Sequence, residues 1–518
     1  MRLKKGSNDL IRRQKAPSFE VGSRGTLQED ASFSKCLSEN KEMMNRAFSG
    51  DGTFILRSFS SSKADFFAVY FDGLINNTAV YESVIRPLMN HAVPISSAEE
   101  IAENVIVNIE TKVIQSVIEC FEAMFSGDCV VFCQGLNRAV VASCKGFPVR
   151  TPQEPASEKT LLGPREGFTE SVLMNVAMVH RKLKTLDFRA ETMTFGTRSG
   201  TKAFLCYLDS LVHPELLREV KRRLSKINMD GVLDTNYLAE QISDARTSLF
   251  RTVGVTERPD VVAAGLLEGR IALILDGTPV VLEIPYIFVE TFQTAEDYYQ
   301  NFWFASIGRI LRILCFFLTI TVPGVFVSLV SYHQELLPTD LALSIASARV
   351  GVPFPIAVEC FLMITVFEIL REASQRLPGN IAQALSIVGA IVIGDAAVSA
   401  HFIGSTTLII VAFAGITGLI SPRLENSVIV LRLYLLILGS LFGLYGVFFG
   451  SISIVFHLMT IKSFGVPYLS YFFSPKGQDQ KDIFIRAPWW TMRNRPGFFA
   501  RNLIRKSDAS WDEKSSES

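Results

Sequence analysis

The pattern of apolar and polar positions differs between two regions of this 518-residue chain. Up to about residue 300 they alternate over short distances, as in a water-soluble domain. Long apolar runs follow, and the first of them contains no Asp, Glu, Lys or Arg. A hydrocarbon core about 30 Å thick requires about 20 apolar residues per helix. The runs therefore predict membrane spans at 313–334, 354–373, 381–403, 405–421 and 428–459, within a membrane domain at 306–474.

The region before the membrane domain predicts a head of two subdomains, 31–146 and 160–305. The linker between them, 147–159, contains three prolines, which favour irregular backbone. The second subdomain is expected to contain helices at 166–184 and about 213–226. The remaining segments are a disordered basic tail at 1–30 and a basic tail at 475–518. The first tail is either solvated or an electrostatic tether to anionic lipid.

Each subdomain carries the signal of a β-hairpin. In the first, strand-like runs at Val130–Cys133 and Ala139–Ser143 flank a short turn that contains glycine. In the second, Ile271–Leu275 and 278–282 flank Asp276-Gly277, one of the stronger short-range turn signals. Two mixed lobes that each contain a hairpin suggest a diverged duplication.

Composition agrees with this division and excludes several functions. Hydrophobic residues make up 48% of the chain and the mean hydropathy is +0.28. The net formal charge is zero, which argues against nucleic acid as a partner. The eight cysteines and six histidines are dispersed, so we expect buried reduced thiols and no metal site. Phosphate loops, dinucleotide fingerprints and nucleophile elbows are absent from the sequence, which predicts no enzyme activity, no catalytic residue and no cofactor.

Two short segments of the second subdomain allow both a structural and a functional interpretation. Residues 163–170 form either an anion-binding turn or a turn shaped by Pro and Gly, in which Glu166 favours the start of the helix. Residues 256–260 form either an ion pair between lobes or subunits, or a turn ahead of a helix.

The membrane domain contains carboxylates that require partners. Glu368 can pair with Arg371 three positions later. Glu359 lies deeper and pairs with a membrane partner, or else is a solvated carboxylate at a helix start. Asp395 lies in a span rich in small residues, where a charge is costly unless it is paired or hydrated.

Basic residues set the predicted orientation. Arg309 and Arg312, then Arg371 and Arg376, then Arg423 and Arg432 mark the inner face, and the C-terminal tail is also basic. The predicted fold is a multi-span α-helical membrane domain with an N-terminal cytosolic α/β (α+β) head of two subdomains. Five crossings would place head and tail on opposite sides. Either 354–373 is re-entrant or 428–474 crosses twice. The run at 428–459 is longer than one perpendicular span needs, so it is expected to be tilted or to break near Gly443–Gly450.

Several motifs in consistent order resemble the GerA family, the A subunits of bacterial spore germinant receptors. The resemblance covers roughly 60–510. Its head motifs are Gly163-Pro164-Arg165-Glu166-Gly167-Phe168-Thr169-Glu170, Thr256-Glu257-Arg258-Pro259-Asp260, Leu267-Glu268-Gly269-Arg270, Asp276-Gly277-Thr278-Pro279 and Glu296-Asp297-Tyr298-Tyr299. Its membrane motifs are Gly351-Val352-Pro353-Phe354-Pro355, Phe367-Glu368-Ile369-Leu370-Arg371-Glu372-Ala373 and Arg376-Leu377-Pro378. Asp395 and the first 30 residues depart from the family pattern.

The resemblance implies a multi-pass protein of the inner spore membrane. Its expected partners are a transporter-like B subunit that senses nutrients, a C subunit that is a lipoprotein, membrane lipid and further copies of the chain in a ring. The ring is expected to be a nutrient-gated channel for monovalent cations whose opening begins germination. The alternatives are a non-conducting paralogue of the stage V sporulation type, a membrane scaffold or a secondary transporter.

The pattern of small residues and the resemblance together predict that the span at 381–403 lines the pore. Val388, Val392 and Asp395 are the candidate pore-lining residues. In such a pore, a ring of apolar side chains closes the path when water leaves the constriction. A carboxylate in the pore wall favours the passage of cations. Close helix packing with Asp395 bonded to a neighbour is the alternative.

Overall fold

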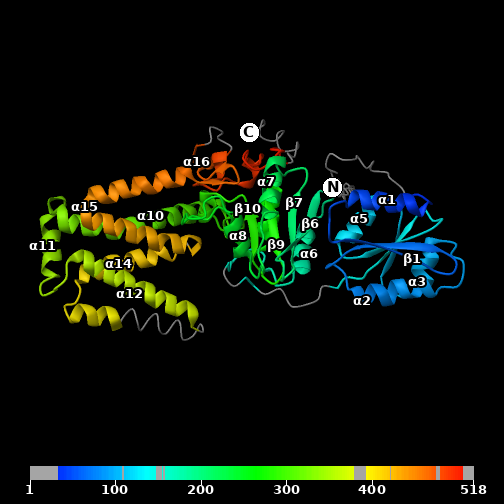
Figure 1. Cartoon of the computed structure of the whole chain (residues 1–518), viewed down its shortest axis with the longest axis horizontal. Helices are drawn as coiled ribbons and strands as arrows, with labels where there is room; N and C mark the ends of the chain where they lie inside the picture. Colours follow the sequence, from blue (N-terminus) through cyan, green and yellow to red (C-terminus); the bar gives the residue numbers. More distant parts are fainter. Residues whose placement is uncertain are drawn as a thin grey trace, which may run out of the picture.

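The computed structural model describes residues 33–107, 110–146, 154–155, 158–377, 392–420, 422–473 and 479–505. Three parts succeed one another along the long axis of the molecule (Figure 1). The first subdomain, in blue, is followed by the second subdomain, in green, and then by a bundle of long helices. The predicted residues 1–30 and Val388 lie outside the described residues.

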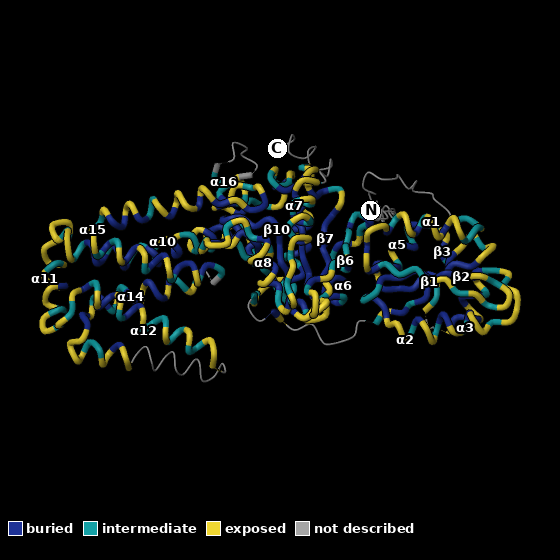
Figure 2. The backbone as a smooth tube through the Cα atoms, viewed as in Figure 1, coloured by how far each residue is buried: buried dark blue, intermediate teal, exposed yellow. Residues whose placement is uncertain are grey.

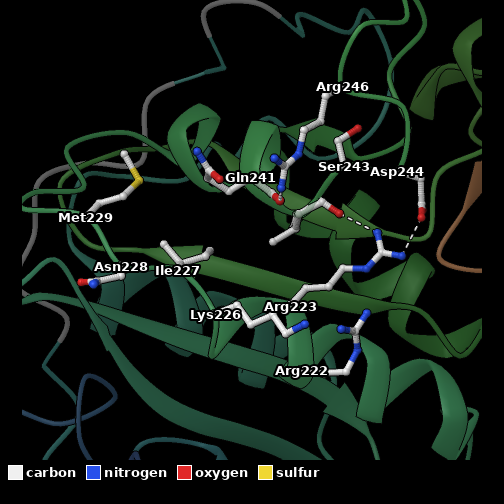
Figure 3. Close-up of a pocket in the computed structure, with 11 residues that line it drawn as sticks. Arg222, Arg223, Lys226, Ile227, Asn228, Met229, Gln241, Ser243, Asp244 and Arg246 are labelled. Atoms are coloured by element: carbon white, nitrogen blue, oxygen red, sulfur yellow. Dashed lines mark hydrogen bonds and ion pairs between the residues drawn. The ribbon is translucent and has the colours of Figure 1, made fainter.

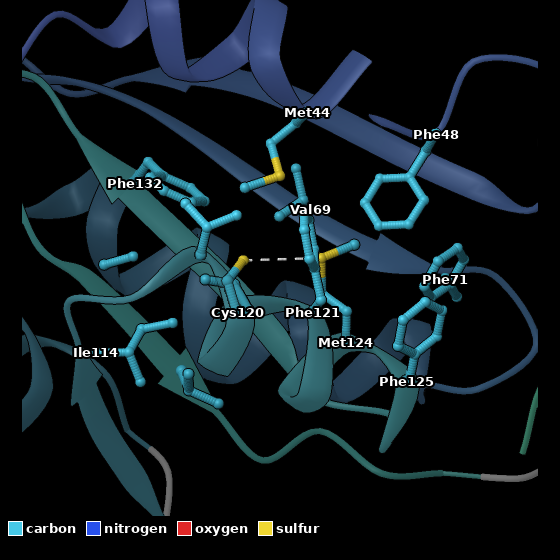
Figure 4. Close-up of a cluster of buried hydrophobic side chains, with 14 of the residues drawn as sticks. Met44, Phe48, Val69, Phe71, Ile114, Cys120, Phe121, Met124, Phe125 and Phe132 are labelled. Carbon is cyan, nitrogen blue, oxygen red and sulfur yellow. Dashed lines mark hydrogen bonds between the residues drawn. The ribbon is translucent and has the colours of Figure 1, made fainter. Parts of the chain in front are cut away.

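The first subdomain is built on an antiparallel sheet of order β1-β2-β4-β5-β3. Its middle strands are buried on both faces, because β2 sends Phe67, Val69 and Phe71 to one side and Phe66 and Ala68 to the other. Figure 4 shows the first of these cores, under α1 and α5. The strands are β1 (Phe54–Ser60), β2 (Asp65–Phe71), β3 (Thr111–Ile114), β4 (Cys129–Cys133) and β5 (Ala139–Ala142). The helices are α1 (Leu37–Ala47), α2 (Asn77–Ala79), η1 (Val80–Ile85), α3 (Arg86–Asn90), α4 (Ala98–Glu100), η2 (Ile101–Val105) and α5 (Val117–Phe125).

The second subdomain repeats this arrangement. Its sheet has the order β6-β7-β9-β10-β8, which is the order of the first sheet when the strands are counted within each subdomain. Helices α6 and α9 cover one face, and α7 and α8 cover the other. The strands are β6 (Phe188–Phe195), β7 (Thr201–Leu208), β8 (Gly254–Thr256), β9 (Ile271–Leu275) and β10 (Val281–Ile284). The helices are α6 (Val172–Lys182), α7 (Pro214–Leu224), α8 (Thr235–Ile242) and α9 (Pro259–Leu267). The shared topology supports the expected duplication.

Both predicted hairpins are confirmed, because β4 pairs with β5 and β9 pairs with β10 in antiparallel register. The helix predicted at 166–184 is shorter and begins at Val172. The two subdomains meet at a buried pair, in which Nε2 of His180 on α6 lies 3.2 Å from Oδ2 of Asp51. Both side chains are almost completely excluded from solvent, so the head contains a polar contact between its halves.

The helical part contains α10 (Phe302–Tyr332), α11 (Thr339–Ser347), α12 (Ile356–Arg376), α14 (Ser405–Gly418) and α15 (Glu425–Thr460). Residues 392–399 are also helical. Two of the described helices, α10 and α15, are long and apolar enough to cross a membrane. Helix α10 begins eleven residues before the predicted span, because its first turns carry the charged residues that join it to the head. Figure 2 shows exposed positions along the outer side of the bundle and buried positions between the helices.

Helix α15 is two arms that fold back on each other at Gly443. The backbone of Gly443 has φ 61° and ψ −147°, which only glycine adopts readily. The hydroxyls of Tyr434 and Ser453 lie 2.8 Å apart, which is impossible along one straight helix. The arms 425–442 and 444–460, the two orange helices of Figure 1, are each about 26 Å long at 1.5 Å per residue. The run at 428–459 therefore consists of two antiparallel arms, and of the two expectations for it, a tilt or a break near Gly443–Gly450, the structure has the break.

This reversal returns the chain to the head. After α15, Ser463 Oγ donates to the carbonyl of Thr252 at 2.7 Å, and Tyr468 Oη donates to the carbonyl of Arg251 at 2.8 Å. Ala500 forms a β-bridge with Val212 of the second subdomain. The C-terminal residues 479–505 thus lie against the head rather than apart from it (Figure 1). The described C-terminal residues and the head therefore lie at the same end of the helical bundle.

Replacement of Gly443 by Ala should destabilise the hairpin. A Cβ there would stand 2.9 Å from Nε2 of His333, and the backbone conformation is unfavourable for any side chain. We expect a loss of about 1–3 kcal/mol in unfolding free energy, measured by denaturation in detergent. Gly308→Ala is the control, because its nearest heavy atom is 3.9 Å away inside a regular helix. Equal stability of both variants would contradict the reversal.

Candidate functional site

Several of the sequence motifs and many charged side chains gather where the second subdomain meets the helices. Arg258 stands immediately before α9 and is 1% exposed. Its guanidinium donates to Asp260 at 2.8 Å and to the carbonyl of Pro164 at 2.7 Å. Tyr299 Oη donates to the same Asp260 carboxylate, and its ring covers Gly163, where a Cβ would collide with it. Three of the motifs found in the sequence therefore form one cluster.

The turn at 163–167 is held by this cluster rather than open to an anion. The amide of Phe168, next to buried Gly167, donates to the carbonyl of Glu257 at 2.8 Å. Glu166 pairs with Arg181 at 2.5 Å and Lys182 at 3.3 Å, at the far end of α6. The predicted role of Glu166 at the start of the helix is therefore wrong. Arg165 is on the surface, 3.9 Å from Glu154.

The residues at 256–260 fulfil one of the two interpretations of their sequence, the turn ahead of a helix. Pro259 is the first residue of α9, so the segment is a turn ahead of a helix. Arg258 and Asp260 also form an ion pair within one lobe. Asp276, in the β9–β10 turn, accepts from the amide of Val172 at 3.1 Å and caps the start of α6. Gly277 adopts φ +88° in that turn.

Glu158, at the end of the predicted linker, connects this cluster to the helices. Its carboxylate accepts from Thr256 Oγ1 at 2.5 Å and lies 2.5 Å from Arg423, in the short segment before α15. Arg423 also donates to the carbonyls of Glu290 and Gln293. Arg423, just before the last long helix, therefore contacts both the linker and the end of the head.

A second ionic cluster lies beside it. Arg270 pairs with Glu290 at 2.6 Å and Glu268 at 3.2 Å, and Glu268 also pairs with Arg505 of the C-terminal segment at 2.9 Å. Glu283 is buried near these groups. Burial raises the pKa of its carboxyl to about 7, against the opposing effect of the Arg270 charge.

The first turns of α10 carry a third cluster. Arg309 is completely buried and pairs with Asp297 at 3.4 Å and with Asp482 at 2.7 Å. Arg312 pairs with Asp297 at 2.5 Å. Tyr298 Oη donates to Asp482 at 2.6 Å. The segment before α10, the helix itself and the C-terminal segment are thus joined through charge.

An apolar core lies within the same junction. Phe250, Phe288 and Phe292 of the head pack with Phe316 of α10 and with both arms of α15. Burial of large aromatic side chains contributes more to such a contact than the surrounding ion pairs. A displacement of the arms must therefore disturb the end of the head.

Inside the bundle the two predicted carboxylates are both paired. Glu359 is buried and binds Arg349 at 2.8 Å, with the amide of Gly404 and the hydroxyl of Thr407 each at 3.0 Å. A solvated carboxylate at the helix start is therefore wrong for Glu359. The predicted pair of Glu368 with Arg371 is present at 2.7 Å, and Arg432 of α15 contacts the same carboxylate.

Two of the three candidate pore residues, Val392 and Asp395, lie on the exposed side of their helix. Val392 is 58% exposed and Asp395 is exposed in the helical stretch 392–399. Among the described residues none pairs with Asp395. Gly394 is buried at the same level, against Leu408 of α14. This helix therefore presents an apolar face with one carboxylate.

Sequence reasoning missed the role of the arginines. Arg309, Arg312 and Arg423 served as markers of the inner face, whereas each is a partner of buried or half-buried carboxylates. The spacing of Arg309 and Arg312, three apart on one helix face, was the available signal. The placement of Glu158 and Asp482 against them requires contacts distant in sequence.

The comparisons with known proteins agree with this architecture. Residues 42–498 match the family described as Bacillus/Clostridium GerA spore germination protein. The chain is 38% identical to the uncharacterized membrane protein YfkQ of Bacillus subtilis (strain 168), over 94% of this chain and 96% of that protein. It is 37% identical to spore germination protein KA of the same organism, over 90% and 87% of the two chains.

A solved structure is also similar to this chain. It is the crystal structure of the N-terminal domain of the A subunit of the Bacillus megaterium spore germinant receptor GerK3. The identity is 28% and the TM-score 0.40, with 50% of this chain and 98% of that chain covered. The family match covers both the head and the helices, so this is a protein of the spore-germination class with an α/β head joined to apolar helices. The chain belongs to the GerA family.

The titration of Glu283 should appear in the stability of the protein. A carboxyl whose pKa rises on folding stabilises the fold below its unfolded value, and this contribution is lost as the pH rises toward about 7. Glu283→Gln keeps the neutral form at every pH. We expect the stability of the variant, relative to that of the natural chain, to increase from pH 5 to pH 8. Thermal unfolding of both proteins in detergent measures this difference. A pH-independent difference would contradict the buried placement.

Proposed function

We propose that this chain is the A subunit of a nutrient germinant receptor in the inner membrane of the bacterial endospore. Family membership supports the class, and relatives carry names such as spore germination protein KA and spore germination protein B1 of Bacillus subtilis (strain 168). In this proposal the helices form a multi-span membrane domain. Head and tail face the cytosol, on the side of the basic residues.

The observation that carries a channel function is the placement of Asp395. An ionised side chain that faces hydrocarbon at the centre of a helix costs about 2.5–3.5 kcal/mol. Asp395 is exposed on an apolar helical stretch, and no described residue neutralises it. Several copies arranged around an axis would turn this face toward water instead of lipid. Asp395 would then attract monovalent cations, and Val392, with Val388 four positions earlier in the sequence, would form an apolar gate.

The receptor would contain other subunits. We propose a transporter-like B subunit as the nutrient sensor and a lipoprotein C subunit, both implied by the family. The arms of α15 expose Leu441, Phe442, Tyr445, Phe448 and Phe449, a surface for lipid or for another membrane subunit. A signal that moves these arms would reach the head through Arg423 and the aromatic core. In this proposal the chain itself has no enzymatic role.

A non-conducting paralogue is the second candidate. It is favoured by the 38% identity to YfkQ, a relative whose name assigns it to the membrane and not to germination. A secondary transporter has less support, because such carriers are built from repeats in the membrane. The repeat in the described part of this chain lies in the head.

Cation flux separates these candidates. The full chain, reconstituted with its B and C subunits into liposomes, should conduct K⁺ when nutrient is added. Asp395→Asn should lower the K⁺ flux about tenfold, equivalent to the loss of about 1.4 kcal/mol of favourable interaction. Asp340→Asn removes the same charge from the exposed start of α11 and is the control. Liposomes that stay impermeable under every nutrient, or equal flux in both variants, would contradict the pore.

A further inference from the structure

A cavity of about 440 Å³ lies between α7 and α8 of the second subdomain, away from the clusters described above. Figure 3 shows its basic side chains. Arg222 is on α7, Lys226 follows the end of α7, and Arg246 lies on the opposite wall. The charged lining residues of the cavity are Arg222, Arg223, Lys226, Asp244 and Arg246. Its size is in the range of small-molecule sites.

The lining has more positive than negative charge. Four cationic side chains face one lining carboxylate, that of Asp244. Arg223 is fixed by Asp244 at 2.5 Å and by Glu219 at 2.8 Å, and Arg222 is fixed by Glu219 at 2.6 Å. These contacts orient two guanidinium groups in advance of any ligand.

The remaining two cations are not neutralised. Arg246 donates to the carbonyl of Gln241 at 2.7 Å and forms no ion pair with a described residue. Lys226 is exposed and forms no ion pair with a described residue either. Like charges gathered in one cavity repel each other, and an anion between them relieves that repulsion. Guanidinium forks match the oxygens of a phosphate group in particular.

The cavity is in contact with the segment that leaves the last apolar helix. The amide of Phe464 donates to Asp244 at 2.6 Å, and the guanidinium carbon of Arg223 lies 4.3 Å from the centroid of the Phe464 ring. Ser248 and His457, near the end of α15, are 2.8 Å apart. A ligand beside Arg223 would therefore lie next to the end of the α15 hairpin.

We propose that this cavity binds a phosphate-bearing ligand through Lys226, Arg246 and Arg222, and that binding fixes the segment after α15 against the head. The phosphate belongs to a lipid headgroup at the membrane surface or to a soluble phosphate compound. Both share the chemistry that the cavity recognises. The proposal concerns binding alone and stands whether or not the chain conducts ions.

The experiment is a melting titration of the full chain in non-ionic detergent. One arm adds inorganic phosphate at constant ionic strength, with chloride as the reference salt. The other adds dihexanoyl phosphatidylglycerol, with dihexanoyl phosphatidylcholine as the reference lipid. A ligand that binds only the folded state raises the melting temperature saturably. We expect saturable stabilisation by at least one of the two phosphate probes.

Paired variants test the residues. Lys226→Gln with Arg246→Gln should weaken the apparent affinity about tenfold or more, equivalent to at least 1.4 kcal/mol. Lys63→Gln with Arg86→Gln removes the same two charges from exposed positions of the first subdomain and should leave the affinity unchanged. Lys226→Gln alone, at an exposed site, provides the test if the double variant melts early.

The outcomes are distinct. A response to phosphate without a response to phosphatidylglycerol assigns a soluble ligand. A response to phosphatidylglycerol, with or without phosphate, assigns a lipid headgroup. Stabilisation no greater than that by chloride and phosphatidylcholine overturns the proposal, as does an equal loss of affinity in the two double variants.

Discussion

The arrangement depends on the burial of one guanidinium group. Arg309 lies at the start of α10 with no exposed surface, and removal of a charge from water is tolerated only when partners replace the water. Those partners are Asp297, just before the helix, and Asp482, far beyond the last apolar helix. The polypeptide must therefore leave the head, pass through the whole bundle and return before Arg309 is satisfied. This requirement places the C-terminal segment against the head, at the same end of the bundle as the start of α10.

The bundle satisfies the requirement by reversal at Gly443 and by close packing of small residues. Gly324 of α10 lies directly against the backbone of Leu435 on the first arm and against Val447 on the second. A larger residue there would separate α10 from the hairpin. Two buried or half-buried carboxylates inside the bundle, those of Glu359 and Glu368, form ion pairs that hold the neighbouring segments in register. Since the arms also share an aromatic core with the head, the helices and the second subdomain are expected to move together.

Features that depend on neighbouring residues were predictable from the sequence, and features that depend on distant residues were not. Asp276-Gly277 between apolar runs predicted its hairpin, and the length of the run at 428–459 indicated either a tilt or a break among its glycines, of which the break is observed. The paired state of Glu359 was open, because its partner Arg349 lies across a turn whose path the sequence does not define. Glu166 was misassigned for the same reason, since its partners are at the opposite end of α6. The pore candidates remain predictions, because their role depends on copies of the chain around an axis.

The central claim is that Arg309 joins the first long helix to the C-terminal segment. A double-mutant cycle with Arg309→Met and Asp482→Ala, measured by unfolding of the full chain in detergent, tests it most directly. The account predicts a coupling free energy of about 2 kcal/mol or more, within the range of residues in direct contact. A coupling below about 0.5 kcal/mol, the value typical of independent sites, would contradict it.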